Sequence, residues 1–129
     1  MKYLVVLLAL LAGCATPPEP GPETPPVTEP LPEAQQRRES VAIAGLMESA
    51  RSDTAAGRLA NAAASLERAL RIEPRNPRLW QELARVRLLQ GEYAQAESLA
   101  ARSNSWAGSD SALRAENQRL IEQARQAAR

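Results

Sequence analysis

Between residues 43 and 110 the chain carries the same pattern twice, and a shift of about 34 residues superimposes the two copies. The shift places bulky residues on bulky ones, small on small and glycine on glycine. The matching pairs are Leu46 and Trp80, Ala50 and Ala84, Gly57 and Gly91, Leu59 and Tyr93, and Ala62 and Ala96. Small residues let two helices touch, and glycine lets the chain turn between them. The period therefore predicts two helical hairpins that stack on each other.

The composition after residue 34 favours helix over strand. This part is rich in Ala, Leu, Arg, Gln and Glu, lacks Phe and has few β-branched residues, and such residues prefer the helix. Gly57, Pro74, Asn76-Pro77 and Gly91 mark the ends of elements. We predict an all-α fold with helices over 33–56, 59–72, 77–90, 93–105 and 111–127, and a loop over 103–109.

The apolar pattern of these helices predicts their buried faces. The expected buried residues of the first two helices are Val41, Leu46, Met47, Ala50, Leu59, Ala62, Ala63, Leu66, Ala69 and Leu70. Those of the later helices are Trp80, Leu83, Ala84, Leu88, Tyr93, Leu113, Leu120, Ile121 and Ala124. Trp106 is also expected in the core, although a tryptophan in a loop can instead anchor a partner.

The period and its pattern resemble the tetratricopeptide repeat. In the first unit the pattern continues through Leu66, Ala69 and Pro74, whereas the second unit departs from it there. The resemblance covers about half the chain. It implies two repeats, at about 43–76 and 77–110. The helix at 111–127 does not fit the repeat pattern, and we predict that it caps the array with a polar outer face.

The amino terminus resembles the signal sequence of a bacterial lipoprotein. A positive start at Met1-Lys2 precedes an apolar run over 4–12, which is too short to span a bilayer. Leu11-Ala12-Gly13-Cys14 resembles the lipobox, which implies cleavage before Cys14 and lipidation of that residue, including acylation such as palmitate. Ala15 after the cysteine implies, by the family's sorting rule, the outer membrane facing the periplasm. The alternatives are an ordinary signal peptide with a chance cysteine, or a buried apolar start.

Residues 15–34 are rich in proline and acidic. Eight of these twenty residues are proline, four are Glu and none is basic. Proline lacks an amide donor and disfavours helix in the residue before it, so we predict a disordered tether that reaches about 60 Å at about 3.1 Å per residue. A ligand for aromatic grooves is the alternative. The predicted division is thus a signal peptide over 1–13, a lipidated linker over 14–34 and a repeat domain over 35–129.

The residue types argue against an enzyme and against a metal site. The chain has no His and a single Cys, and no phosphate-binding loop is present. Acidic residues alternate with Arg at helical spacing, as in Glu48 and Arg51, which indicates solvated ion pairs. The excess of four positive charges after residue 34 is too small for a nucleic-acid-binding surface. We expect no cofactor apart from the covalent lipid on Cys14.

The resemblance to tetratricopeptide repeats implies a protein partner on the concave face, which the first helix of each repeat lines. The family's groove positions fall on Met47, Arg51, Thr54, Arg78, Gln81, Arg85, Leu88 and Leu89. Two forked arginine side chains beside apolar ones suit an acidic, partly apolar peptide. Two ordinary exposed arginines are the alternative.

The complete layout resembles small tetratricopeptide-repeat outer-membrane lipoproteins, and most of all the LpoP type of activator. That resemblance implies a non-catalytic protein that binds and activates a class A penicillin-binding protein of the inner membrane in peptidoglycan synthesis. Two alternatives remain open. One is a scaffold for another envelope machine, such as a pilus secretin or a protease adaptor, and the other is a structural protein that binds peptidoglycan. The sequence does not fix the oligomeric state.

Overall fold

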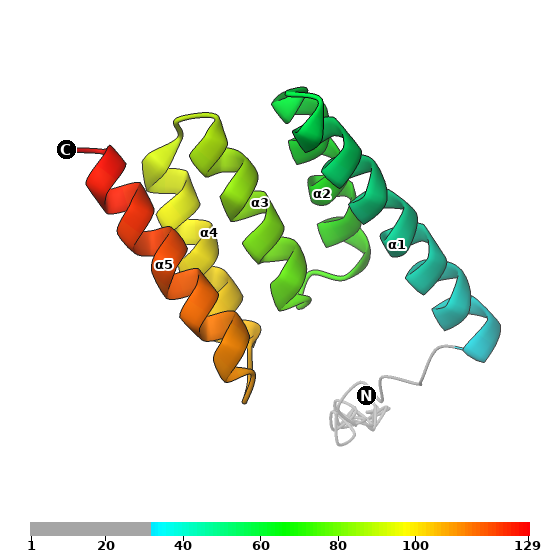
Figure 1. Cartoon of the computed structure of the whole chain (residues 1–129). Coiled ribbons are helices and arrows are strands. Elements are labelled where there is room, and N and C mark those ends of the chain that lie inside the picture. The colour runs from blue at the N-terminus through cyan, green and yellow to red at the C-terminus, as the bar shows by residue number, and fades with distance from the viewer. Residues whose placement is uncertain (1–31) are drawn as a thin grey trace, which may run out of the picture. The chain divides into compact units, whose positions relative to one another are not determined.

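The computed structural model describes residues 32–129, and these residues belong to one compact unit. Within the described residues the chain forms five α-helices, shown in Figure 1. They are α1 (Glu33–Ala55), α2 (Leu59–Ile72), α3 (Pro77–Leu89), α4 (Tyr93–Trp106) and α5 (Ser111–Ala127). The predicted all-α fold is confirmed. The predicted signal peptide, Cys14 and nearly all of the proline-rich linker lie outside the described residues.

The helices form two antiparallel hairpins, α1 with α2 and α3 with α4, and α5 packs on α4 (Figure 1). The turn inside each hairpin contains a glycine with a left-handed backbone, Gly57 at φ 74° and Gly91 at φ 78°. Only glycine adopts this conformation at little cost. The recurrence of glycine one repeat period later therefore reflects two equivalent turns.

The core runs between the helices in two clusters. The first joins α1, α2 and α3 and is centred on Leu66 and Leu79, which are almost completely buried. The second joins α3, α4 and α5 through Ala84, Ala100 and Leu120. Most of the predicted core is confirmed, including the small residues of α2 and the apolar stripe of α5.

Val41 is an exception, because 68% of its surface is exposed, and Ile43 is buried instead. Two residues along a helix are about 200° apart around its axis, so Val41 and Ile43 face in nearly opposite directions. The 23-residue α1 is also longer than the 14-residue α2. Its amino-terminal turns therefore have less of a partner helix to bury them.

The predicted helix over 93–105 and the predicted loop over 103–109 overlap at residues 103–105, and the structure places these residues in α4, which continues to Trp106. Ser103 is fully buried, and its hydroxyl donates to the backbone carbonyl oxygen of Pro77 at 2.7 Å. A tertiary hydrogen bond thus fixes a serine in a helix where its local preference is for a turn. Trp106 is not a core residue either, since 40% of its surface is exposed.

Helix α5 follows the repeat period, contrary to the prediction. The caps of α3 and α5 occupy equivalent positions one period apart, since Asn76 accepts from the Arg78 amide and Asp110 accepts from the Leu113 amide. The buried residues also match at this spacing, as Leu79 with Leu113, Leu83 with Asn117, and Val86 with Leu120. Helix α5 therefore packs on α4 as α3 packs on α2, and it caps the array as the first helix of an incomplete third repeat.

Candidate functional site

A groove with a volume of about 330 Å³ lies between α1 and α3. Its floor consists of buried apolar side chains, Ala50 from α1, Leu66 from α2 and Val86 from α3. The remaining lining residues are Met47, Arg51, Thr54 and Ala55 from α1, and Glu82, Arg85 and Leu89 from α3. First helices of consecutive repeats thus form its two walls, as the family pattern predicts.

The walls present apolar side chains to solvent. Leu89 is 60% exposed and Met47 is half-buried. The Thr54 hydroxyl donates to the Ala50 carbonyl oxygen at 2.7 Å, so its donor is already satisfied within α1. An exposed leucine beside an apolar floor is the kind of feature that a protein partner buries.

The charges of the groove repeat along the array. Arg51 lies 3.6 Å from the Glu48 carboxylate, and Arg85 lies 3.2 Å from the Glu82 carboxylate, at equivalent positions of the two repeats. Arg85 also donates to Glu116 of α5 at 2.9 Å. Arg51 makes the longer of these contacts and its side chain is 61% exposed, so it is the cation more available to a ligand.

The structure brings five of the eight predicted groove residues together in this groove: Met47, Arg51, Thr54, Arg85 and Leu89. Three others do not line it. The Gln81 side chain is buried and donates to Glu116 at 3.2 Å and to Asn117 at 3.1 Å. Leu88 packs against the cluster of Ala84, Leu120 and Ile121.

Arg78, the third of these residues, lies 3.7 Å from Asp110, the cap of α5. One feature of the fold accounts for the positions of all three residues. Helix α5 packs against α4 and α3 where a longer array would continue, and therefore it meets positions of α3 that the family pattern assigns to a ligand.

Sequence reasoning missed Ala50, Ala55, Leu66, Glu82 and Val86 as lining residues. Glu82 had a usable signal, because it lies one repeat period after Glu48 and one helical turn before Arg85. The other four residues, Ala50, Ala55, Leu66 and Val86, line the groove only because of the distance at which α1 and α3 pack, and the sequence does not give that distance.

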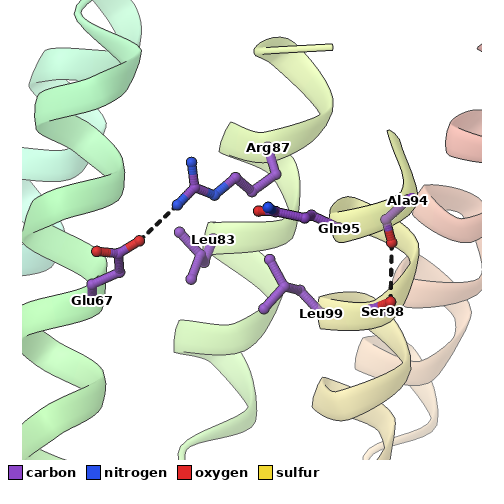
Figure 2. A pocket seen from close by; sticks show the side chains of 7 residues that line it. All are labelled: Glu67, Leu83, Arg87, Ala94, Gln95, Ser98 and Leu99. Atoms are coloured by element: carbon purple, nitrogen blue, oxygen red, sulfur yellow. Dashed lines mark hydrogen bonds and ion pairs between the residues drawn. The ribbon is translucent and has the colours of Figure 1, made fainter. Parts of the chain in front are cut away.

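A second depression, of about 420 Å³, lies over α2, α3 and α4 and is shown in Figure 2. Arg87 crosses it and donates to Glu67 at 2.7 Å, to Gln90 at 3.0 Å and to Glu92 at 3.3 Å. Two carboxylates already neutralise this guanidinium, so the depression is a poor site for an anionic ligand. The ion pair between Arg87 and Glu67 instead joins the two repeats.

Within residues 32–129 no group of three or more His, Cys, Asp or Glu side chains is arranged to hold a metal ion. In the same part of the chain, no helix combines the length and apolarity needed to cross a bilayer.

Stacked helical hairpins with a period of about 34 residues, and a groove between their first helices, define a tetratricopeptide-repeat protein. Residues 53–116 match the family model described as tetratricopeptide repeat. The chain also resembles the solved globular C-terminal domain of P. aeruginosa LpoP, with 45% sequence identity and a TM-score of 0.66. The match covers 67% of this chain and 82% of that domain. The chain therefore belongs to the family of LpoP-like tetratricopeptide-repeat proteins. No curated protein matches its sequence.

Proposed function

We propose that this chain is a non-catalytic outer-membrane lipoprotein that binds and activates a class A penicillin-binding protein through the groove between α1 and α3. The fold is that of a protein-interaction domain, and membership of the LpoP-like family supports this partner. The single observation that carries the binding site is the groove itself, with its apolar floor, the exposed Leu89 and the accessible Arg51.

The sequence before residue 35 supports the location. The lipobox pattern that ends in Cys14 favours a lipid anchor, and several acyl chains hold a protein on a membrane far more firmly than one. The proline-rich residues 15–34 would let the repeat domain reach a synthase in the opposite membrane. In this proposal Cys14 anchors the chain and the groove binds the partner.

Apolar side chains in the centre of an interface supply most of its affinity, and charges direct the partner into position. Met47 and Leu89 would therefore bind an apolar side chain of the synthase. Arg51 would pair with a carboxylate beside it, because its single contact at 3.6 Å with Glu48 is weak.

The test is the affinity of the full chain, purified in detergent, for a purified class A penicillin-binding protein from the same cells. The groove variant is Arg51→Glu/Leu89→Asp, in which both residues are exposed, so the core is unchanged. We expect it to bind at least about tenfold more weakly than the wild type, which corresponds to about 1.4 kcal/mol.

The matched control is Arg37→Glu, an exposed α1 residue that does not line the groove, and it should bind within about twofold of the wild type. If the wild type, the groove variant and the control bind with equal affinity, the synthase remains the partner but the groove is not its binding site. No binding by the wild type would reject the synthase as the partner.

A further inference from the structure

Two arginines and two tryptophans form a compact cluster away from the groove, here called the Arg–Trp cluster. The Arg102 guanidinium lies 4.6 Å from the centre of the Trp80 ring, and that of Arg75 lies 5.4 Å from the centre of the Trp106 ring. Both distances are typical of cation–π contacts. Arg75 is in the α2–α3 loop and Trp106 is in the last turn of α4, which lie at the same end of the helices (Figure 1).

Two further relationships link the residues of the cluster. Arg102 and Trp106 are four residues apart on α4 and so lie on one face of that helix. The Trp80 indole N–H donates to the Pro74 carbonyl oxygen at 2.8 Å, and Pro74 directly precedes Arg75. Each cation of the cluster is thus held beside an indole on a well-defined scaffold.

Neither arginine of the cluster is neutralised within residues 32–129, because no ion pair there includes Arg75 or Arg102. By contrast, Arg51, Arg85 and Arg87 each have a carboxylate partner. The acidic residue nearest to Arg75 in sequence is Glu73, whose carboxylate already accepts from the Asn76 side chain at 2.8 Å.

The two stacked guanidinium groups are suited to bind carboxylates. Stacking on an aromatic face leaves the N–H donors at the edge of a guanidinium free for forked hydrogen bonds to a carboxylate. It also restricts the side chain, so less conformational entropy is lost on binding. The exposed Trp106 provides apolar surface beside Arg75.

A related but weaker arrangement exists in the first repeat. Leu46 and Arg68 lie one repeat period before Trp80 and Arg102, and both line a shallow depression between α1 and α2. Arg68 has no ion pair in the described residues, but Leu46 offers no aromatic ring on which to stack. The paired cation–indole arrangement thus belongs to the second repeat.

We propose that the Arg–Trp cluster is a second docking site, for an acidic protein segment that carries two carboxylates on either side of an apolar residue. Charge complementarity favours this occupant, because Arg75 and Arg102 are restricted cations without an ion pair in the described residues and Trp106 is exposed. The proposal does not rest on the function proposed above, because none of the four residues lines the groove.

A glycan is a less suitable occupant. Sugar rings stack on aromatic faces, and in this cluster a guanidinium already covers one face of each indole. An anionic membrane surface requires a broad field of positive charge, and the cluster offers two cations held in place. A protein segment with two carboxylates at a defined spacing can pair with the two arginines while each arginine stays beside its indole.

The test uses tryptophan fluorescence, because the two tryptophans of the chain are both in the cluster. The full chain in detergent is titrated with twelve-residue peptides that lack tryptophan. In these peptides two glutamates are separated by one to six apolar residues, and each peptide has a counterpart in which glutamine replaces glutamate. We expect a saturable change of emission with at least one glutamate peptide and none with its glutamine counterpart.

The cluster variant is Arg75→Gln/Arg102→Gln, and the matched control is Arg37→Gln/Arg38→Gln, which removes two exposed charges outside the cluster. The cluster variant should bind the peptide at least about tenfold more weakly, and the control within about twofold of the wild type. To keep the test independent of changes in emission, affinities are also measured by calorimetry.

Equal losses in both variants would show a general charge effect and overturn the proposal. Absence of saturable binding for every glutamate peptide would also overturn it. So would cluster-dependent binding to purified sacculi or to phosphatidylglycerol vesicles in place of the peptides, because the occupant would then be a glycan or a membrane.

Discussion

The Arg85 guanidinium donates to the Glu116 carboxylate at 2.9 Å and so joins a wall of the groove to the capping helix α5. Both side chains are partly exposed, at 42% and 46%, and ion pairs of this kind contribute little to stability. The contact therefore restrains Arg85 more than it stabilises the fold.

This relationship leads to the first prediction. Glu116→Gln removes the charge but keeps an oxygen acceptor, so the free energy of unfolding should change by less than about 1 kcal/mol. Urea denaturation of the full chain measures this change. A loss above about 2 kcal/mol, which is closer to the cost of breaking a buried ion pair, would mean that this contact is a principal support of α5.

The second prediction concerns Asn117, the buried polar residue of α5. Its side-chain N–H groups donate to the Ser103 hydroxyl at 2.8 Å and to Asn104 at 2.9 Å, and its oxygen accepts from Gln81. Asn117→Ala removes all three hydrogen bonds from a buried site, although Ser103 keeps its bond to Pro77 and Gln81 its bond to Glu116. We therefore expect a loss of about 1–3 kcal/mol of unfolding free energy. The same denaturation measurement tests it, and a loss below about 0.5 kcal/mol would show that the network is dispensable.

The third prediction compares one chemical change at two glycines. Gly57 has φ 74°, so Gly57→Ala should destabilise the protein by about 1–2 kcal/mol although no atom lies within 4 Å of the added carbon. Gly45 lies inside α1 with equally open surroundings, and Gly45→Ala should stabilise the protein by about 0.5–1 kcal/mol. Thermal unfolding of both variants provides the comparison, and shifts of the same sign would contradict this account of the turn.

The fourth prediction separates the real core from the face that sequence alone assigns to it. Leu66 is 1% exposed and Leu66→Ala should cost about 2–5 kcal/mol, because it removes buried methyl groups and leaves a cavity. Val41→Ala should change the unfolding free energy by less than about 0.5 kcal/mol, since Val41 is largely exposed. The midpoints of urea denaturation of the two variants and the wild type test both values. A large effect at Val41 would indicate that another surface covers this residue in solution.

Local signals in the sequence were sufficient for most of the fold. Gly57 and Gly91 mark turns by their backbone requirement, and the cap at Asn76 begins α3 at Pro77, as predicted. The features that were not predicted depend on tertiary contacts. The Ser103 hydroxyl bonds to Pro77 of α3, and Trp106 lies outside the core beside Arg75.

The candidate groove was predicted better on α1 than on α3. The groove positions transferred to α1, namely Met47, Arg51 and Thr54, all line it. On α3, Gln81 and Leu88 face contacts with α5 instead. The family pattern describes an array that continues, whereas here an incomplete third repeat covers those positions, and the sequence alone did not indicate that α5 follows the repeat register.

The central claim is tested most directly by the rate of glycan polymerisation by a purified class A penicillin-binding protein, with and without the full chain in detergent. We predict that the wild type and Arg37→Glu accelerate the reaction, and that Arg51→Glu/Leu89→Asp does not at the same concentration. If the chain binds the synthase but leaves its rate unchanged, the proposed activation is wrong and a scaffold role stands in its place.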